Sequence, residues 1–187
     1  MNIILFGPPG AGKGTQSKYL INKTKGFQIS TGDLLRDEMK KQTEIGKLIT
    51  NDMNKGMFVN DDIVNKIIKK IALDPNKNGN LIFDGYPRSL SQAKFLDTLL
   101  KDSNQIIDYV IFLNVNKETI IKRIEKRKFL EKRSDDELNT ILKRYDTYMQ
   151  TTKPVLNFYS KNPNFYEVDG ALEIDEITRK IDSFINV

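Results

Sequence analysis

The fold is decided by residues 2–15, which read NIILFGPPGAGKGT. After Asn2 the run to Phe6 is apolar without interruption, which is typical of a strand buried on both faces. The glycine-rich loop that follows lets backbone N–H groups converge on an anion, because glycine has no Cβ to obstruct them. Helical spacing resumes at Thr15, and a helix N-terminus adds about half a positive charge to the full charge of Lys13. Strand, loop and helix predict a phosphate cradle, in preference to the simpler interpretation of a turn between a strand and a helix.

One position in this loop departs from the general phosphate-loop pattern. That pattern has Ser or Thr directly after the lysine as a Mg²⁺ ligand. Here Gly14 follows Lys13, and Thr15 comes one residue later. We therefore expect the metal to have fewer direct protein ligands, with other residues holding its water molecules.

The composition limits the possible functions. The 187 residues are enough for one core with small insertions but not for two full domains. Cys and His are absent, which excludes disulfides, thiolate metal sites and imidazole as a base or zinc ligand. No stretch approaches the roughly 18 apolar residues of a membrane span, and the first residues lead straight into a strand, so we expect a cytoplasmic protein without a signal peptide. The net charge of +5 suits nucleotides and nucleic acid alike.

Further apolar strands alternate with helical segments along the chain. We expect these strands at residues 27–30, 81–83, 109–113 and 165–168. Apolar strands separated by helices imply a parallel sheet with helices on both faces. The sequence therefore predicts an α/β fold of three layers around a five-stranded parallel sheet, with ligands at the carboxyl ends of the strands.

Residues 30–59 interrupt this alternation. The segment is polar and has too few apolar side chains to form core, so we expect a mobile flap over the sheet. Glycine breaks helices, which predicts breaks within the flap at Gly46 and Gly56.

A second irregular stretch follows the helix that begins at Lys117. Its apolar pattern fails near residues 128–133, where we expect the helix to end. Residues 134–137 match a capping box and predict the start of the next helix. Proline lacks a backbone N–H, so we expect Pro154 to interrupt that helix.

Charged side chains recur around these strand ends and loops. Asp84 ends an apolar strand, where nucleotide-binding sheets place a carboxylate that organises Mg²⁺. The arginines outside repetitive helix faces are Arg36, Arg88, Arg123, Arg127, Arg133 and Arg144. A single arginine is more often a surface ion-pair residue, but several beside a phosphate-loop lysine suit the oxygens of phosphate groups. This set indicates two phosphorylated substrates facing each other rather than one nucleotide and a water molecule.

Five motifs together resemble adenylate kinase. They are residues 7–16, residues 31–36, residues 84–88 with Gln92, residues 133–136, and residues 168–170. They occur in the order and spacing of that family and cover nearly the whole chain. The resemblance implies reversible, Mg²⁺-dependent transfer of the terminal phosphoryl group of ATP to AMP, giving two ADP and serving adenine nucleotide homeostasis.

The resemblance also implies site residues. It implies an ATP site at Gly10, Ala11, Gly12, Lys13, Gly14, Thr15, Arg123, Arg127 and Gly170. It implies an AMP site at Thr31, Arg36, Met57, Val59, Gly85, Arg88, Gln92, Arg133 and Arg144. Phosphoryl transfer is expected to involve Lys13, Asp84, Arg88, Arg123, Arg133 and Arg144. The waters of Mg²⁺ would be held by Asp33 and Asp84, and the bond before Pro87 would be cis.

The same resemblance implies a domain organisation. It predicts a core of residues 1–29, 60–126 and 134–187, a flap of residues 30–59 over AMP, and a short lid of residues 127–133 over ATP. Closure of flap and lid would exclude water, which otherwise diverts transfer into hydrolysis. With no Cys or His, zinc in the lid is excluded. We expect ATP, AMP and ADP as the partners, neither nucleic acid nor membrane, and a monomer.

Other functions would require different features. A UMP/CMP kinase shares the loop and short lid, but Thr31 and Gln92 match the AMP pattern, and Gln92 can pair with an adenine edge. A broad small-metabolite kinase would not need residues 31–33 together with residues 84–88. A GTPase-like switch would show Asn-Lys-x-Asp, and an RNA-binding module would interleave aromatic and basic side chains on a strand face. The chain shows neither pattern.

Overall fold

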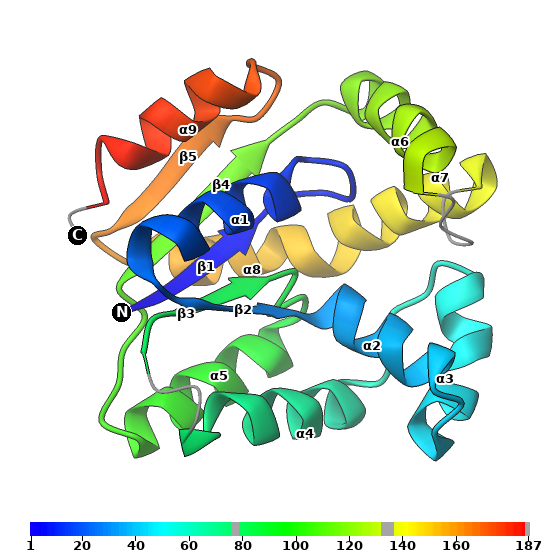
Figure 1. The fold of residues 1–187 in the computed structure, drawn as a ribbon, viewed down its shortest axis with the longest axis horizontal. Helices are drawn as coiled ribbons and strands as arrows, with labels where there is room; N and C mark the ends of the chain where they lie inside the picture. Colours follow the sequence, from blue (N-terminus) through cyan, green and yellow to red (C-terminus); the bar gives the residue numbers. More distant parts are fainter. Residues whose placement is uncertain (76–78, 132–136, 186–187) are drawn as a thin grey trace.

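The computed structural model describes residues 1–75, 79–131 and 137–185. Within these ranges, five parallel strands form one sheet in the order β2-β3-β1-β4-β5 (Figure 1). The strands are β1 (Asn2–Phe6), β2 (Phe27–Ser30), β3 (Leu81–Asp84), β4 (Tyr109–Asn114) and β5 (Phe165–Asp169). The predicted α/β fold with a five-stranded parallel sheet is confirmed.

Helices pack against both faces of the sheet, which makes three layers (Figure 1). One face is covered by α1 (Lys13–Thr24), α6 (Lys117–Glu131) and α9 (Ile174–Asp182). The other face is covered by α4 (Asp61–Ala72), α5 (Leu90–Asp102) and α8 (Lys153–Tyr159).

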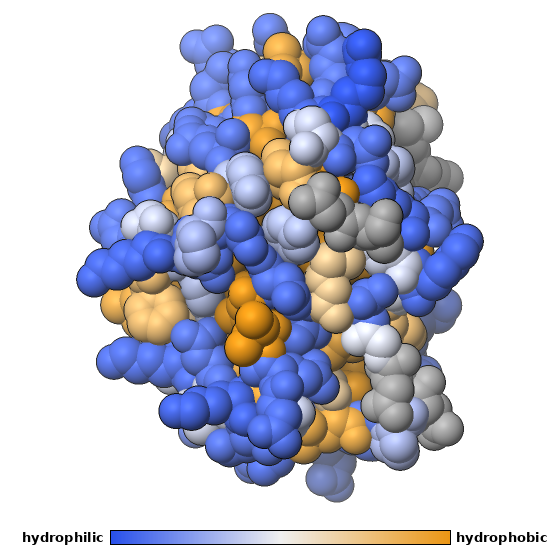
Figure 2. All heavy atoms as spheres, turned by 90° about the vertical axis from the view of Figure 1, so that its left-hand side faces the viewer, coloured by the Kyte–Doolittle hydropathy of each residue, from blue (hydrophilic) through white to orange (hydrophobic). Residues whose placement is uncertain are grey.

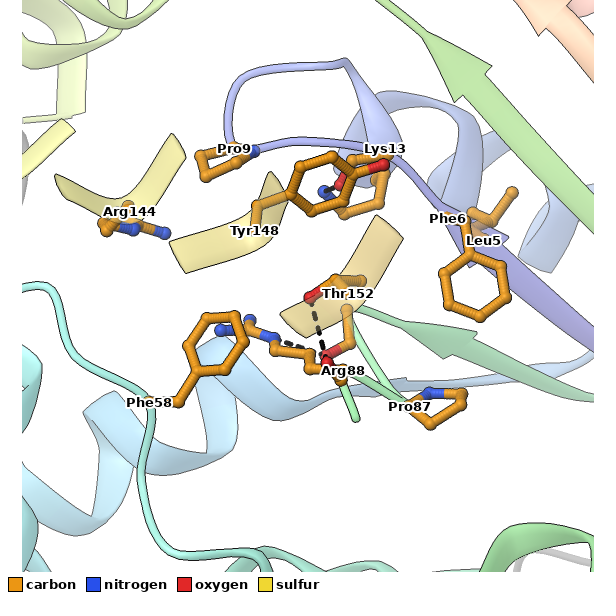
Figure 3. A pocket seen from close by; sticks show the side chains of 12 residues that line it. Leu5, Phe6, Pro9, Lys13, Phe58, Pro87, Arg88, Arg144, Tyr148 and Thr152 are labelled. Atoms are coloured by element: carbon orange, nitrogen blue, oxygen red, sulfur yellow. Dashed lines mark hydrogen bonds between the residues drawn. The ribbon is translucent and has the colours of Figure 1, made fainter. Parts of the chain in front are cut away.

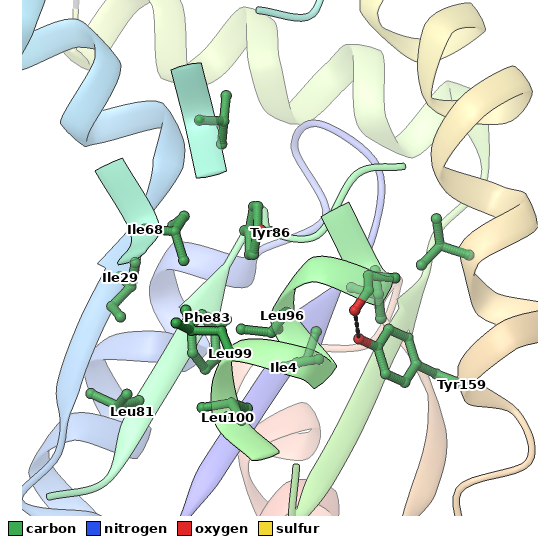
Figure 4. Packing of buried hydrophobic residues seen from close by; sticks show 14 of the residues in the cluster. Ile4, Ile29, Ile68, Leu81, Phe83, Tyr86, Leu96, Leu99, Leu100 and Tyr159 are labelled. Carbon is green, nitrogen blue, oxygen red and sulfur yellow. Dashed lines mark hydrogen bonds between the residues drawn. The ribbon is translucent and has the colours of Figure 1, made fainter. Parts of the chain in front are cut away.

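The central strand β1 contributes to both apolar layers. Ile3 and Leu5 belong to the cluster beneath α1, α6 and α9. Ile4 and Phe6 belong to the cluster beneath α4, α5 and α8, in which Figure 4 shows Ile4. Successive side chains of a strand point to opposite faces, so a strand covered on both sides is apolar at every position. This explains the uninterrupted run in the sequence, and each such buried side chain contributes about 1.5–3 kcal/mol of transfer free energy.

The carboxyl ends of the strands meet at one edge of the sheet. Asp84, the last residue of β3, pairs in register with Leu5 of β1 on one side and with Ser30 of β2 on the other. The loops after β1 and β3 and the start of α2 (Thr31–Lys40), which follows β2 directly, therefore lie side by side, on the right of the sheet in Figure 1. This edge is the one that the sequence predicted for ligands.

The segment of residues 30–59 contributes to the core, so the expectation that it lacks core residues is wrong. It forms α2 (Thr31–Lys40) and α3 (Glu44–Asn54). Leu35, Ile49 and Val59 are each at most 5 % exposed and belong to the same apolar cluster as α4 and α5. A few well-spaced apolar side chains are enough, because each helix buries only one stripe.

Gly46 does not break a helix, contrary to the prediction. It lies in the first turn of α3, where its N–H donates to the capping Thr43 side chain at 2.9 Å. A Cβ at Gly46 would lie 2.1 Å from the Glu38 carbonyl oxygen, so the glycine permits close packing of α3 on the end of α2. Gly56 does follow the end of α3, with φ +69°, as expected.

Helix α6 runs through Glu131, which lies within residues 128–133, where the apolar pattern predicted its end. Phe129 is 88 % exposed, so this apolar side chain on the solvent side breaks the apolar periodicity there. Lys128 instead pairs with Glu137 at 2.8 Å.

The next helix, α7 (Leu138–Thr147), begins with Glu137 as its N-cap and no side-chain capping bond. The capping box predicted at residues 134–137 lies mostly outside the described residues.

Pro154 does not interrupt the helical course of the chain, contrary to the prediction. From α7 the backbone passes through a π-helical turn, η2 (Tyr148–Thr152), and continues directly into α8. Pro154 lies in the first turn of α8, where a missing N–H is tolerated. The wider turn before it takes up the disturbance.

Candidate active site

The loop between β1 and α1 has the conformation of an anion cradle. Gly10 adopts φ +81° and Gly12 φ +95°, a left-handed conformation that side chains with a Cβ rarely adopt. The Gly12 carbonyl accepts from the N–H groups of Thr15 at 3.0 Å and Gln16 at 3.1 Å, which begins α1 directly after the loop. The helix N-terminus therefore faces the loop, as the sequence predicted.

The Lys13 ammonium lies inside this loop. It donates to the carbonyl oxygens of Gly7 at 2.8 Å and Pro8 at 3.0 Å. The loss of surrounding water lowers the pKa of Lys13 from 10.5 to about 8. The charge of Asp84 raises this pKa, and the charges of Arg88, Arg144 and Arg127 lower it further. One carboxylate and several cations thus converge on the loop, an arrangement that suits a polyanion.

Asp84 lies beside the start of α1, as predicted. It is 8 % exposed, and a Cβ at Gly14 would lie 4.0 Å from its Oδ2 atom. The side chain of Gln28, on the neighbouring strand β2, donates to the same Oδ2 at 2.9 Å. Gln28 was not among the predicted site residues, because a glutamine in a short strand carries no local motif.

Arg88 lines a pocket between the phosphate loop and α7 (Figure 3). Its Nε donates to the Gly85 carbonyl at 2.7 Å, and its guanidinium lies over the Phe58 ring, 5.2 Å from the centroid. Lys13 and Arg144 line the same pocket, which gathers three of the predicted cations. The Tyr86–Pro87 peptide that precedes Arg88 is cis, as predicted.

Arg123 points elsewhere. Its Nη1 donates to the Gly170 carbonyl at 2.6 Å and its Nη2 to the Leu172 carbonyl at 3.4 Å. The structure therefore places Arg123 against the loop after β5, together with the predicted Gly170.

The predicted AMP residues after β2 and β3 also meet. The Thr31 hydroxyl donates to the Gly85 carbonyl at 2.7 Å. Arg36 forms an ion pair with Asp33 at 2.6 Å, so Asp33 faces Arg36 in α2. Arg36 also lines a second pocket with Arg88 and Arg144, next to the first.

The second pocket extends to the end of the segment of residues 30–59. Met57 and Phe58 line it, whereas Val59 is 5 % exposed and packs in the core. Gln92 is 2 % exposed; its Oε1 accepts from the Arg88 N–H and its Nε2 donates to Asp61, each at about 2.6–2.7 Å. The amide of Gln92 thus supports the loop that carries Arg88.

Several lining residues were missed by the sequence analysis. They are Pro9, Phe58, Tyr148 and Thr152. Aromatic and hydroxyl side chains of this kind are equally common in cores, so no local pattern singles them out. The predicted Arg133 lies outside the described residues.

Metal and membrane features can be assessed for the described parts of the chain. There, no cluster of three or more His, Cys, Asp or Glu side chains could hold a metal ion by itself. No helix in those parts is both long enough and apolar enough to cross a membrane.

Comparisons with known proteins agree with this geometry. A family model described as adenylate kinase matches residues 5–164. An adenylate kinase of Pelagibacter ubique is 46 % identical over 213 aligned positions, which cover all of both chains. One from Maricaulis maris is 41 % identical over 181 positions, covering 97 % of this chain and 96 % of its own. One from Archaeoglobus fulgidus is 37 % identical, covering 99 % and 98 %.

Proposed function

Because the chain belongs to the adenylate kinase family, it is an ATP:AMP phosphotransferase, and we propose how its residues divide this reaction. The observation that carries the proposal is the convergence of charge on Lys13. Arg88 and Arg144 line one pocket with Lys13, and Arg127 and Asp84 act on its pKa. A site for two phosphorylated substrates needs such a concentration of cations.

The donor side is built on the phosphate loop. Residues 10–15 bind the ATP phosphates, and Lys13 contacts the group that is transferred. Its present partners are two carbonyls of its own loop, and phosphate oxygens are stronger acceptors for an ammonium. Arg127 lies near the ATP phosphates. The contact between Arg123 and Gly170 supports placing both beside ATP, with Gly170 at the base and Arg123 at the phosphates.

The acceptor side is built on α2, which follows β2 directly, and on the loop after β3. Arg36 and Arg88 bind the AMP phosphate from the second pocket, which both line. Thr31 and Gly85, with the backbone of Met57 and Val59, surround the nucleoside, and Gln92 belongs to this side through its bond to the Arg88 N–H. The bond from Thr31 to Gly85 supports this grouping.

The transfer itself needs positioning more than acid–base chemistry. An oxygen of the AMP phosphate attacks the terminal phosphorus of ATP, and the bond to the bridging oxygen breaks, so each product is ADP. Charge spreads over the oxygens of the transferred group, and Lys13, Arg88, Arg123 and Arg144 stabilise it without a proton donor. Arg133, predicted for the same role, is part of the proposal on sequence grounds alone.

Nucleotide-bound Mg²⁺ is general in this family, and the chain offers a carboxylate that fits it. Asp84 supplies hard oxygen atoms beside the start of α1, and Gln28 fixes one of them. Asp84 and Asp33 would hold the waters of the ion, Asp33 after leaving Arg36. When bound, Mg²⁺ neutralises charge on the phosphates. We propose no zinc.

We further propose the division into core, flap and lid. The core comprises residues 1–29, 60–126 and 134–187, the flap residues 30–59 and the short lid residues 127–133. The flap contacts α7 at its end, where Gly56 lies against Thr140 and Arg144. Arg144 lines the first pocket with Lys13 and Arg88, so this contact connects the flap to the cations of the site. We also propose a cytoplasmic monomer that binds neither nucleic acid nor membranes.

A coupled assay of ADP formation tests the proposed function. ATP is supplied with AMP, CMP or UMP, with and without Mg²⁺. Fast, Mg²⁺-dependent ADP formation with AMP alone is the expected result. Preference for CMP or UMP would overturn the acceptor site, and loss of ATP without any acceptor would overturn the two-substrate arrangement.

A further inference from the structure

The main chain of Arg88 is held on both sides by side chains from other elements. Thr152 Oγ1 donates to the Arg88 carbonyl at 3.0 Å (Figure 3). The Arg88 N–H donates to Gln92 Oε1 at 2.7 Å. With both peptide groups bonded, the direction in which the Arg88 side chain leaves the backbone is restrained.

Thr152 reaches this carbonyl from the π-helical turn η2. It is 4 % exposed, and the Lys153 N–H after it donates to the Tyr148 carbonyl, five residues back. Such a turn contains one more residue than an α-helical turn, and Tyr148 and Thr152 at its two ends both line the pocket. π-helical turns within α-helices are frequent at functional sites.

On the other side, Gln92 is itself oriented by Asp61, the first residue of α4. Asp61 Oδ1 accepts from Gln92 Nε2 at 2.6 Å, and Asp61 Oδ2 accepts from the Ser89 hydroxyl at 2.6 Å. An ionised carboxylate only accepts hydrogen bonds, so the amide nitrogen of Gln92 must face it. The amide oxygen is thereby left for the Arg88 N–H.

We propose that Thr152 and the Asp61–Gln92 pair are positioning residues for phosphoryl transfer, because they hold the Arg88 main chain so that its guanidinium lies beside Lys13. This inference rests on the proposed function, which makes Arg88 a phosphate ligand. The Arg88 side chain is held as well, because its Nε donates to the Gly85 carbonyl and its guanidinium lies over the Phe58 ring. A shift of about 1 Å in such a group can lower a rate by about 100-fold.

The test replaces the hydroxyl without changing the volume much. Thr152→Val should lower kcat by about tenfold or more and leave the KM for ATP unchanged. Thr152→Ser, which keeps the donor, should restore kcat to within about twofold of wild type. The matched control is Thr151→Val, because Thr151 is exposed and donates only within its own helix, to the Thr147 carbonyl. If Thr152→Val lowers the melting temperature but keeps wild-type kcat below it, Thr152 is merely structural and the proposal is overturned.

The contact of the Asp61–Gln92 pair with the Arg88 N–H is tested by Asp61→Asn, with Asp62→Asn as the control. An amide in place of the Asp61 carboxylate would offer one acceptor oxygen to two donors, so the orientation of Gln92 is no longer imposed. We expect a lower kcat for Asp61→Asn and wild-type behaviour for Asp62→Asn, since Asp62 is exposed. A wild-type kcat for Asp61→Asn would remove Asp61 from the proposal.

A double-mutant cycle with Arg88→Ala separates this inference from the proposed function. If Thr152 acts through Arg88, Thr152→Val should have no further effect on kcat once Arg88 is alanine. Additive effects would overturn the positioning role. If Arg88→Ala itself keeps wild-type kcat, the role of Arg88 in the proposed function is wrong and the inference falls with it. If Arg88→Ala is slow and Thr152→Val is not, only the inference falls.

Discussion

The side chain of Lys13 is held by hydrogen bonds to its own phosphate loop. Its ammonium donates to two carbonyls of that loop, and the charges of Arg88, Arg144 and Arg127 lower its pKa. A buried charge next to other positive charges costs folding free energy, and it becomes favourable when a polyanion enters. Lys13 therefore lowers the folding stability of the free protein and raises its affinity for a polyanion, as expected at a functional site.

Lys13→Met should leave the fold intact and lower kcat by about 100-fold or more, because the only side-chain cation of the loop is lost. The melting temperature should not fall, since a desolvated charge is removed. Turnover is measured by the coupled assay and folding by circular dichroism. Lys18→Met, at an exposed position of the same helix, is the control. A folded Lys13→Met enzyme with near-normal turnover would contradict the role of Lys13.

ATP binding should weaken as the pH rises above about 8. Burial lowers the pKa of Lys13 to about 8, so above this value the nucleotide must bring a proton onto the lysine. We expect the Kd for ATP, measured by calorimetry, to be about tenfold higher at pH 9 than at pH 7. In Lys13→Met this dependence should disappear. An equally steep rise in the mutant would show that another group titrates.

The lowered pKa of Lys13 also makes the free energy of unfolding depend on pH. Stability rises with pH, whereas ATP affinity falls. Between about pH 8 and 10.5 the unfolded chain binds more protons than the folded chain, so the contribution of Lys13 to the free energy of unfolding rises with pH across this window. Below about pH 8 its full destabilising effect is present.

At the scale of elements, the packing of α3 on α2 depends on one missing side chain. Gly46 lies so close to the Glu38 carbonyl that a Cβ would be 2.1 Å from its oxygen. The two helices and Val59 complete an apolar stripe that joins the flap to the core.

Gly46→Ala should therefore lower the free energy of unfolding by about 2–3 kcal/mol, since the helices must separate to admit the methyl group. Urea denaturation measures this change. Asn51→Ala, an exposed substitution in the same helix, should change stability by less than about 0.5 kcal/mol. If the two variants are equally stable, α2 and α3 can separate without cost, and the flap is not packed as described.

For the whole molecule, the cations converge from the core, the flap side and α6–α7 on one edge of the sheet. On the face shown in Figure 2, hydrophilic side chains predominate and the hydrophobic areas are small and separate. The convergence of these cations supports the proposed closure of the site.

A bisubstrate analogue, with two adenosines joined through five phosphates, should draw the flap and lid together. Binding should lower the radius of gyration in X-ray scattering and raise the melting temperature, because it occupies both halves of the site. AMP alone should produce a smaller change. An unchanged radius of gyration with a raised melting temperature would contradict the proposed closure while leaving binding intact.

Local sequence determined much of this protein. The apolar run before Gly7 predicts a strand covered on both faces, the glycines and Lys13 predict the phosphate cradle, and Asp84 at a strand end predicts its place beside that cradle. Each inference uses residues within a few positions of one another, where backbone conformation and side-chain periodicity are set by short-range sterics. The same short range explains the errors at Gly46 and Pro154, where packing and a π-helical turn overrode local preference.

Only the tertiary structure decided how the functional side chains are supported. Gln28 meets Asp84 because β2 lies beside β3, and Thr152 meets the Arg88 carbonyl across 64 positions of sequence because α8 packs against α5. Arg123 likewise turns to Gly170 because α6 lies next to the loop after β5. These partners are chosen by the packing of whole elements, which depends on the sum of many weak apolar contacts and leaves no mark in the residues nearby.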